Sequence, residues 1–313
     1  MAVWVDLEVP VTDENFEEHG YLIANPDVVV GRDWASGRQH FEAYGRSEGR
    51  KIRLLEASMP FRSEKLRRLE SHLRDDMPFE RRGLTLDFLT PELRRATAIK
   101  DTQNVSCNRY DGYVEALIEE LSDGLILDCG AGRRDRYYAN VVNFEIVPYD
   151  STDVLGVGEK LPFTDATFDG VVSIAVLEHV RDPFQCAAEI VRVLKPGGKL
   201  ICCVPFLQPV HGYPRHYYNM TREGLRALFE KSLKIEDHRV IASMLPIWSL
   251  HWVVDSWAAG LSAETRERFL DMPVRELLRP PDSTLGEPWV RELSEEKNFE
   301  LASATLLFAR KPQ

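Results

Sequence analysis

The feature that most constrains the fold is the run LILDCGAG at residues 125–132, in which a short apolar segment ends at Asp128 and turns through Gly130 and Gly132. A strand that is buried on both faces of a parallel sheet reads as a continuous apolar run. The turn at its carboxyl end needs residues without a Cβ wherever a ligand meets the backbone. The run therefore predicts a buried parallel strand and a turn that a nucleotide-like ligand can approach closely, although a plain strand-to-helix turn has the same pattern.

The residues after this turn disfavour a dinucleotide-binding fingerprint. Its third glycine would fall where the chain has Asp135, and only residues 133–140 precede the next apolar run, VVNFEIV at 141–147. Any first helix is therefore about two turns at most. Glu145 lies near the end of this second predicted strand, where an acidic side chain can hold a ribose diol by two hydrogen bonds.

Two longer motifs follow: LPFTDATFDGVVSIAVLEHVRDP at 161–183 and EIVRVLKPGGKLICCVPF at 189–206. With LDCGAG, they resemble the class I S-adenosylmethionine-dependent methyltransferases, of the type 11 kind, over residues 101–312. The resemblance implies an α/β fold with a Rossmann-like seven-stranded sheet and helices on both faces. It also implies an enzyme that uses S-adenosyl-L-methionine and releases S-adenosyl-L-homocysteine. The implied cofactor-binding residues are Asp128, Gly130, Ala131, Gly132, Glu145, Glu159, Leu161 and Ala175.

The sequence departs from the family pattern at one position near the adenine. Family members commonly carry an acidic residue about four positions before the Leu of LPF, and here that position is Val157, followed by Gly158 and Glu159. Glu159 or backbone amides would have to replace the missing contact. The departure keeps open a non-catalytic scaffold or binding protein with a methyltransferase fold, whereas the intact glycine turn and Glu145 favour an active enzyme.

Length and composition set outer bounds on the function. A chain of 313 residues with 44% hydrophobic residues can hold one large α/β domain and a smaller appendage. The net charge of −11 argues against a nucleic-acid surface, which carries a basic footprint. The five cysteines lack metal-binding spacing, so we expect buried thiols in a reducing compartment and no metal. The first twenty residues do not resemble a secretory signal, which favours a cytoplasmic protein.

The chain divides into three predicted parts. Residues 1–56 form a small helical module, 57–100 a charged linker helix, and 101–313 the methyltransferase domain with a helical insertion at about 244–297. The patterns YLxxNPDV and HFxxYGxxEGR within the first part resemble a helical module of bacterial polysaccharide-biosynthesis and glycosyltransferase proteins. The module is either a docking unit for glycan machinery or a cap packed on the enzyme. Its predicted core is Tyr21, Leu22, Val28, Phe41 and Tyr44.

The linker FRSEKLRRLESHLRDD at 61–76 places Leu66, Leu69 and Leu73 on one helical stripe. Its interleaved charges favour a solvated outer face over a surface for anionic lipid or a partner. A second helix with apolar residues at helical spacing is expected over 113–121, just before the first strand. The family resemblance implies that residues 104–110, ahead of that helix, close over the methionine moiety.

Histidines and aromatic residues gather after the fourth and fifth predicted strands. LEH at 177–179 brings His179 to the carboxyl end of a strand, near the transferred methyl, although a structural or helix-capping role fits equally well. The loop HGYPRHYY at 211–218 is the predicted acceptor site, with packing against the next helix as the alternative. The candidate catalytic bases are His179, His211 and His216, and the candidate substrate-binding residues are Tyr213, Arg215, Tyr217 and Tyr218.

The last third of the chain predicts two more strands, at 234–242 and 298–312. Between them, MLPIWSLHWVVDSWAAGL at 244–261 carries three tryptophans but is a poor transmembrane span because polar residues and a proline interrupt it. A lid over the acceptor, a surface for a homodimer, and an interfacial membrane helix all fit this insertion.

These observations favour an O-methyltransferase that acts on a sugar or another hydroxylated intermediate of bacterial surface-polysaccharide biosynthesis. A small lipid-like or quinone-like acceptor is the alternative if the tryptophan-rich insertion lines an apolar pocket. The expected partner is a small-molecule or glycan acceptor and not nucleic acid. A peripheral membrane surface and a glycosyltransferase stay open as further partners, because fold resemblance does not determine the acceptor.

Overall fold

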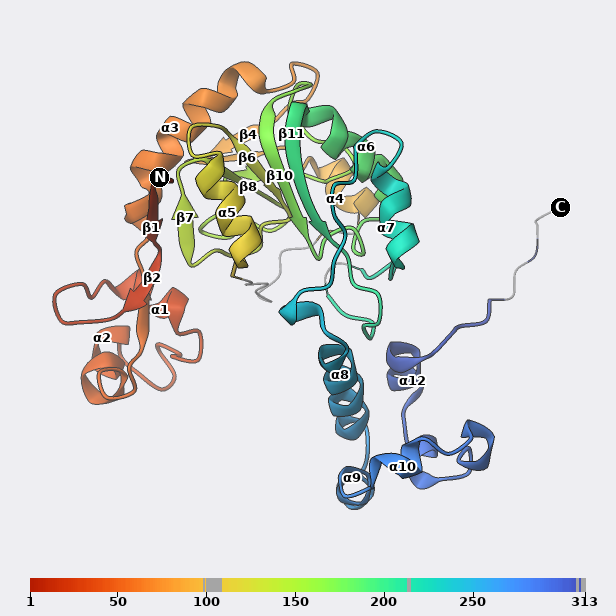
Figure 1. The fold of residues 1–313 in the computed structure, drawn as a ribbon. Coiled ribbons are helices and arrows are strands. Elements are labelled where there is room, and N and C mark those ends of the chain that lie inside the picture. Colours follow the sequence, from red (N-terminus) through yellow and green to blue (C-terminus); the bar gives the residue numbers. More distant parts are fainter. Residues whose placement is uncertain (98, 100–108, 213–214, 308–309, 311–313) are drawn as a thin grey trace.

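The computed structural model describes residues 1–97, 99, 109–212, 215–307 and 310, and its centre is a seven-stranded sheet (Figure 1). The strand order is β11-β10-β6-β8-β9-β5-β4, and all neighbours pair in parallel except β4 and β5. The strands are β4 (Glu80–Arg82), β5 (Thr85–Asp87), β6 (Ile126–Cys129), β8 (Val141–Glu145), β9 (Val154–Leu155), β10 (Phe168–Ile174) and β11 (Leu194–Cys203). The predicted α/β class with a seven-stranded sheet is confirmed.

Helices cover both faces of the sheet, as predicted. Helix α5 (Gly112–Glu120) begins at Asp111, whose side chain accepts hydrogen bonds from the first-turn N–H groups, and it packs Leu117 and Ile118 against one face. Helix α6 (Pro183–Val193) packs its apolar stripe, which includes Ile190, into the main core on the other face. Burying one such apolar side chain fully stabilises the folded state by about 1.5–3 kcal/mol relative to leaving it exposed.

The outer strands of the sheet are not the ones that the sequence predicts. Residues 234–242 form no strand, and α12 (Glu295–Leu301) occupies the start of the predicted seventh strand, whose last residues lie partly outside the described ranges. The β4–β5 hairpin, which the sequence analysis missed, extends the opposite edge instead. Leu86 of this hairpin is fully buried and pairs with Val154 of β9, so burial of an apolar side chain favours that edge. Within the described residues β11 therefore has one strand neighbour.

Helix α3 (Met59–Leu69) packs one face into the main core. Leu66 and Leu69 are buried, as the stripe predicts, and Leu73 is half-buried beside them. Two of its cations are buried as well: the Lys65 ammonium donates to Asp153 Oδ2 at 2.9 Å, and Arg62 is 8% exposed. Glu64 and Arg67 form an exposed ion pair, as a solvated charged face predicts, whereas Arg62 and Lys65 depart from the prediction because they find carboxylate and carbonyl partners under the sheet edge.

The N-terminal module is tied to the large domain by strands. Strand β1 (Trp4–Asp6) pairs with β7 (Arg136–Tyr138), and β2 (Glu8–Pro10) pairs with β3 (Lys51–Arg53). Helices α1 (Glu18–Ala24) and α2 (Gly37–His40) complete the module. Its small core contains the predicted Tyr21, Leu22, Val28 and Phe41, together with Val11, Phe16 and Trp34. Tyr44 is 53% exposed, so its predicted place in this core is wrong.

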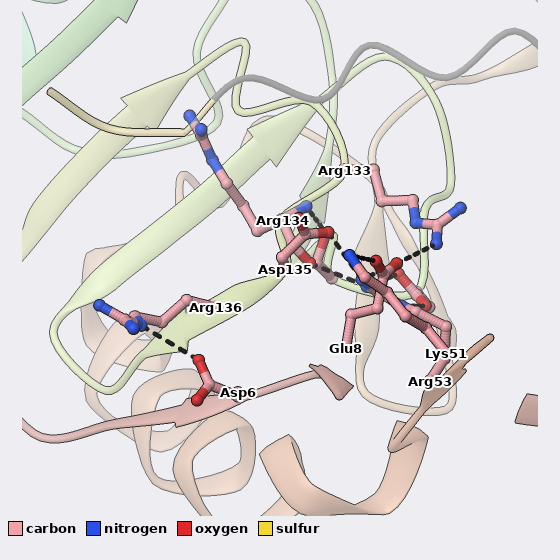
Figure 2. Close-up of polar contacts among 10 residues, drawn as sticks. Asp6, Glu8, Lys51, Arg53, Arg133, Arg134, Asp135 and Arg136 are labelled. Atoms are coloured by element: carbon pink, nitrogen blue, oxygen red, sulfur yellow. Dashed lines mark hydrogen bonds and ion pairs between the residues drawn. The ribbon is translucent and has the colours of Figure 1, made fainter. Parts of the chain in front are cut away.

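Charged side chains join this module to the loop that follows the glycine turn (Figure 2). Glu8 accepts hydrogen bonds from Lys51 Nζ at 2.8 Å and from Arg133 Nη2 at 3.0 Å. Arg53 donates to the carbonyl of Arg134 and to the carboxylate of Asp135. The loop at 133–135 is therefore held from the outside by the N-terminal module.

The tryptophan-rich insertion extends away from the sheet with a small core of its own (Figure 1). It contains α8 (Pro246–Ala259), α9 (Ala263–Leu270), α10 (Val274–Leu277), α11 (Pro288–Arg291) and α12, and it follows α7 (Arg222–Phe229). Trp257, Phe269 and Trp289 pack together in that core. Across the described residues, no helix combines the length and apolar character needed to cross a membrane.

Candidate functional site

A cavity of about 1230 Å³ opens where β6, β8 and β10 reach their carboxyl ends. This edge of a parallel sheet is where ligands gather, because the loops that leave the strands diverge there. Part of α4 (Pro91–Thr97) and one residue of α8 close the cavity from outside. Wall residues at the strand ends are Gly130, Ala131, Glu145, Ile146, Val147, Ala175, Val176 and His179.

The glycine turn has the backbone conformation that the sequence predicts. Gly130 and Gly132 have φ values of +88° and +65°, which favour glycine. A Cβ on Gly130 would lie 2.3 Å from Cγ2 of Val176, so the turn also packs closely against the end of β10. The N–H groups of Gly130 and Ala131 donate to the carbonyl of Phe144, which fixes the turn on β8.

Glu145 binds the backbone of this turn. Its carboxylate accepts hydrogen bonds from the N–H groups of Gly132 at 3.0 Å, Ile146 at 2.6 Å and Val147 at 3.1 Å. Burial raises the pKa of Glu145, and these three donors work against that shift. A carboxylate offers about four acceptor positions, so one remains for a ligand. The sequence predicts two hydrogen bonds between Glu145 and a ribose. To form both, one of the three backbone N–H groups would have to release the carboxylate.

Asp128 lies beneath the turn and is buried. Its Oδ2 accepts hydrogen bonds from Arg134 Nη2 at 2.5 Å and from the Tyr110 hydroxyl, while Oδ1 has no partner among the described residues. The Arg134 guanidinium also stacks 3.9 Å from the centre of the Tyr110 ring. The sequence analysis did not assign Arg134, although the pair of arginines that follows the glycine turn was a signal that could have pointed to it.

The other predicted cofactor residues divide into two groups. Glu159 and Ala175 line the cavity: Glu159 Oε1 accepts the N–H of Arg181 at 3.1 Å, and Ala175 has a positive φ of +55°. Leu161 is fully buried in the main core and donates its N–H to Glu189. Asp128, Gly132 and Leu161 are absent from the cavity wall, and for all eight residues a cofactor contact stays a prediction. Residues 104–108 lie outside the described residues.

The three candidate histidines come together beside the cavity. The ring centres of His179 and His211 are 5.2 Å apart, and His216 lies 4.4 Å from His211 and 5.6 Å from His179. His179 and His211 line the cavity, whereas His216 stands behind them. Burial lowers the pKa values of His179 and His211, which favours their neutral forms. The catalytic roles of the three residues stay predictions.

Glu178, next to His179, is a site residue that the sequence analysis missed. The side chain is fully buried, and neither carboxylate oxygen has a hydrogen-bond partner in the described part of the chain. Burial raises the pKa of Glu178 to about 8. The motif LEH contained the residue, but nothing in the sequence distinguished a buried acid from one at the surface.

The predicted acceptor loop contributes tyrosines to the wall. Tyr217 and Tyr218 line the cavity, and the Tyr218 hydroxyl donates to the carbonyl of Arg181 at 3.1 Å. Arg215 is exposed and outside the wall, while its carbonyl accepts a hydrogen bond from the ring of His179. Tyr213 lies outside the described residues. Trp252 of α8 completes this side, with its ring centre 4.8 Å from that of His211.

Comparison with protein families finds one match over this region. Residues 127–202 match the family model described as a methyltransferase domain. The match begins in β6, includes the glycine turn, Glu145, Glu178 and His179, and ends in β11. The core of the candidate site therefore lies within a segment that is similar to a methyltransferase domain.

Curated relatives match over short segments. An uncharacterized methyltransferase of Schizosaccharomyces pombe is 44% identical over 63 residues, which are 20% of this chain and 23% of that protein. A demethylmenaquinone methyltransferase of Lysinibacillus sphaericus is 33% identical over 94 residues, which are 29% of this chain and 40% of that protein. The chain thus spans less than half the length of these relatives.

Among solved structures, a phosphoethanolamine N-methyltransferase of Haemonchus contortus, in complex with S-adenosylhomocysteine, is similar at 15% identity. The likeness covers 56% of this chain and 47% of that chain, with a TM-score of 0.32.

Proposed function

We propose that this chain is an S-adenosylmethionine-dependent methyltransferase that acts on a small molecule held in the cavity. The observation that carries the proposal is the glycine turn at the carboxyl ends of β6 and β8. Glu145 accepts a hydrogen bond from the backbone of this turn, and both lie inside the segment that matches a methyltransferase domain. A turn of this kind presents backbone to a ligand without an intervening Cβ. The scaffold alternative keeps the same turn but predicts no methyl transfer.

The residues present fit the cofactor. Single-ligand pockets measure about 300–1,000 Å³, so a cavity of about 1230 Å³ has room for the cofactor and a small acceptor. Glu145 retains an acceptor position for a ribose hydroxyl, Glu159 stands at the wall for the base, and the Arg134 guanidinium offers donors to a carboxylate. When bound, the cofactor supplies a methyl group on a sulfonium, whose leaving thioether is neutral.

The main contribution of the chain to such a transfer is alignment. Because the methyl donor needs little activation, the principal requirement is to position the acceptor. Such positioning lowers the activation free energy by several kcal/mol, up to about 7–11 kcal/mol. Tyr217, Tyr218 and Trp252 line the same cavity as the glycine turn, where they would contact an acceptor and limit its exposure to water. His179 is fixed in orientation by the carbonyl of Arg215 at 2.8 Å.

The acceptor that the wall favours is a quinone-like aromatic ring. Trp252 and Tyr217 offer aromatic faces, Phe184 and Val180 add apolar surface, and flat rings stack on such faces. The demethylmenaquinone methyltransferase among the relatives supports this choice. A hydroxylated sugar is the second candidate, because the hydroxyl and imidazole groups of the 211–218 loop offer hydrogen bonds to a polar ring.

The direct test is methyl transfer from S-adenosylmethionine labelled on its methyl group. Purified full-length protein is incubated with a reduced naphthoquinone and, separately, with a panel of nucleotide-activated sugars. We expect label in the naphthoquinone product. Label in a sugar instead would support the second candidate, and a folded protein that binds S-adenosylhomocysteine but labels neither would contradict the acceptor assignment.

A further inference from the structure

Two imidazoles of the cavity wall lie close to a carboxylate that is buried beside them. The ligand atoms of Glu178, His179 and His211 all lie within 4.8 Å of one another. Glu178 and His179 are neighbours after β10, whereas His211 comes from the loop after β11. Two separate loops therefore bring together the donor set of two imidazoles and one carboxylate that divalent transition metals prefer.

Backbone carbonyls fix the tautomers of both imidazoles. His179 Nδ1 lies 2.8 Å from the carbonyl of Arg215, and His211 Nδ1 lies 2.9 Å from the carbonyl of Pro209. A carbonyl oxygen only accepts, so each Nδ1 carries the proton and donates it. Each Nε2 is then left with a free lone pair. This is the arrangement by which outer hydrogen bonds orient metal-binding histidines.

His216 has a supporting place in the same cluster. Its Nδ1 accepts the backbone N–H of His211 at 3.2 Å, and its Nε2 lies 3.0 Å from Oδ1 of Asn219. Both ring nitrogens are therefore occupied. His216 packs against His211 and holds its backbone, and its nitrogens do not complete the donor set.

The buried carboxylate is the second, independent observation. Glu178 is fully buried, and both of its oxygens lack a hydrogen-bond partner among the described residues. A buried carboxylate without a partner costs several kcal/mol. Such groups in folded proteins are paired, protonated or bound to a metal.

The spacing fits a bridging ion better than a direct hydrogen bond. Glu178 Oε1 and His179 Nε2 are 3.7 Å apart, which is too far for a hydrogen bond between them. Two ligand atoms that share a tetrahedral Zn²⁺ at about 2.0–2.1 Å stand roughly 3.3 Å apart. A shift of a few tenths of an ångström in this pair, together with a somewhat larger movement of His211, would complete the geometry.

We propose that Glu178, His179 and His211 bind a divalent transition metal, with Zn²⁺ as the first candidate. The ligand atoms are one carboxylate oxygen of Glu178 and the Nε2 atoms of the two histidines. Three protein ligands leave at least one coordination position open, as in catalytic rather than structural zinc sites. Because His179 and His211 line the cavity, the open position faces it.

Gly212 shapes the loop around this centre. Its φ is +80°, and a Cβ there would lie 2.3 Å from Cε1 and 2.9 Å from Nε2 of His179. Any larger residue would therefore strain the backbone and displace the imidazole edge that carries the free lone pair. The close approach of this loop to His179 depends on glycine.

The metal would also extend the proposed function, and this extension rests on that function. An oxygen of the acceptor would occupy the open position, and its coordination would favour the deprotonated, more nucleophilic form. Metal binding itself requires no methyl transfer, so the two proposals can be tested separately.

The test is calorimetric titration of the full-length, EDTA-treated protein with ZnCl₂, repeated with CoCl₂ while visible absorption is recorded. We expect one ion per chain and a Co²⁺ absorption spectrum typical of four- or five-coordinate nitrogen and oxygen ligation. Glu178→Gln and His211→Ala should each weaken Zn²⁺ binding roughly tenfold or more, because each removes a ligand. The control His238→Ala, at a half-buried histidine outside the cluster, should bind as the wild type does.

Circular dichroism shows whether each variant is folded, and S-adenosylhomocysteine binding, measured separately, tests the proposed function. The metal proposal is overturned if the wild type binds no ion at 1:1 stoichiometry, or if folded Glu178→Gln and His211→Ala variants retain wild-type affinity. Zn²⁺ binding without S-adenosylhomocysteine binding would support the metal site and contradict the proposed function. The reverse result would contradict the metal site alone.

Discussion

Arg53 and Asp150 form a two-pronged ion pair between the N-terminal module and the loop that follows the second core strand. Arg53 Nε lies 2.8 Å from Oδ2 of Asp150, and Nη2 lies 2.7 Å from Oδ1. The arginine is 1% exposed and also donates to the carbonyl of Arg134, two residues after the glycine turn. One side chain of the module thus binds both loops that border the candidate cofactor site.

Replacing Arg53 should therefore destabilise the protein strongly. Arg53→Met fills a similar volume but leaves the Asp150 carboxylate without its main partner, and removing one member of a buried pair costs about 3–5 kcal/mol. Urea denaturation followed by circular dichroism measures the free energy of unfolding. Arg38→Met is the control, because Arg38 pairs with Asp13 and Glu42 at the surface and should matter little. Equal stability of the two variants would contradict this role of Arg53.

The buried Lys65 should make stability depend on alkaline pH. Burial lowers the pKa of Lys65 to about 8, and the nearby Asp153 only partly offsets this shift. The native state then loses the proton near pH 8, whereas the unfolded chain keeps it to about pH 10.4. Between these values the unfolded state binds more protons, so Lys65 contributes a rise in stability with increasing pH.

The measurement compares wild type with Lys65→Met from pH 7.5 to 9.5. The variant should be less stable at pH 7.5, since it leaves the buried Asp153 without one of its cationic partners. The difference in unfolding free energy should then grow by on the order of 1 kcal/mol per pH unit above pH 8, because only wild type carries the titrating amine. Parallel stability curves for the two proteins would show that Lys65 has no such shift.

Two tryptophans on one helix offer a matched test of the acceptor wall. Trp252 lines the cavity beside His211, whereas Trp248 is 56% exposed and its indole donates to the carbonyl of Ala242. Trp252→Ala should raise the KM for the acceptor roughly tenfold through lost aromatic contact, with little change in S-adenosylhomocysteine affinity. Trp248→Ala should leave both quantities near wild type. An equal effect of both substitutions would mean that α8 acts as a whole and not through its wall residue.

The strands that continuous apolar runs predict are present in the structure, and their residues are buried on both faces of the sheet. LIL at 125–127 and VVNFE at 141–145 became β6 and β8, whose residues are all buried. The hairpin at 80–87 was missed because β4 reads ERR, and only its pairing with β5 makes it a strand. The strands expected at 234–242 and 298–312 did not form, since none of their described residues lies in a strand.

The candidate site was predictable where a local pattern determines geometry. The positive φ values at Gly130 and Gly132 follow from the turn itself. The gathering of His179 with His211 followed from their positions after neighbouring strands. The isolation of Glu178 could not be read from the sequence, because it depends on loops from two strand ends closing over one carboxylate.

Calorimetric titration with S-adenosylhomocysteine tests the central claim most directly. Wild-type protein should bind one molecule per chain, and Glu145→Ala should bind at least about tenfold more weakly, because the substitution frees the Gly132 N–H and removes the ribose acceptor. Circular dichroism must show that the variant is folded, and Glu115→Ala, at an exposed position on α5, is the matched control. A folded wild type that does not bind, or a Glu145→Ala variant with unchanged affinity, would contradict a cofactor site at the glycine turn.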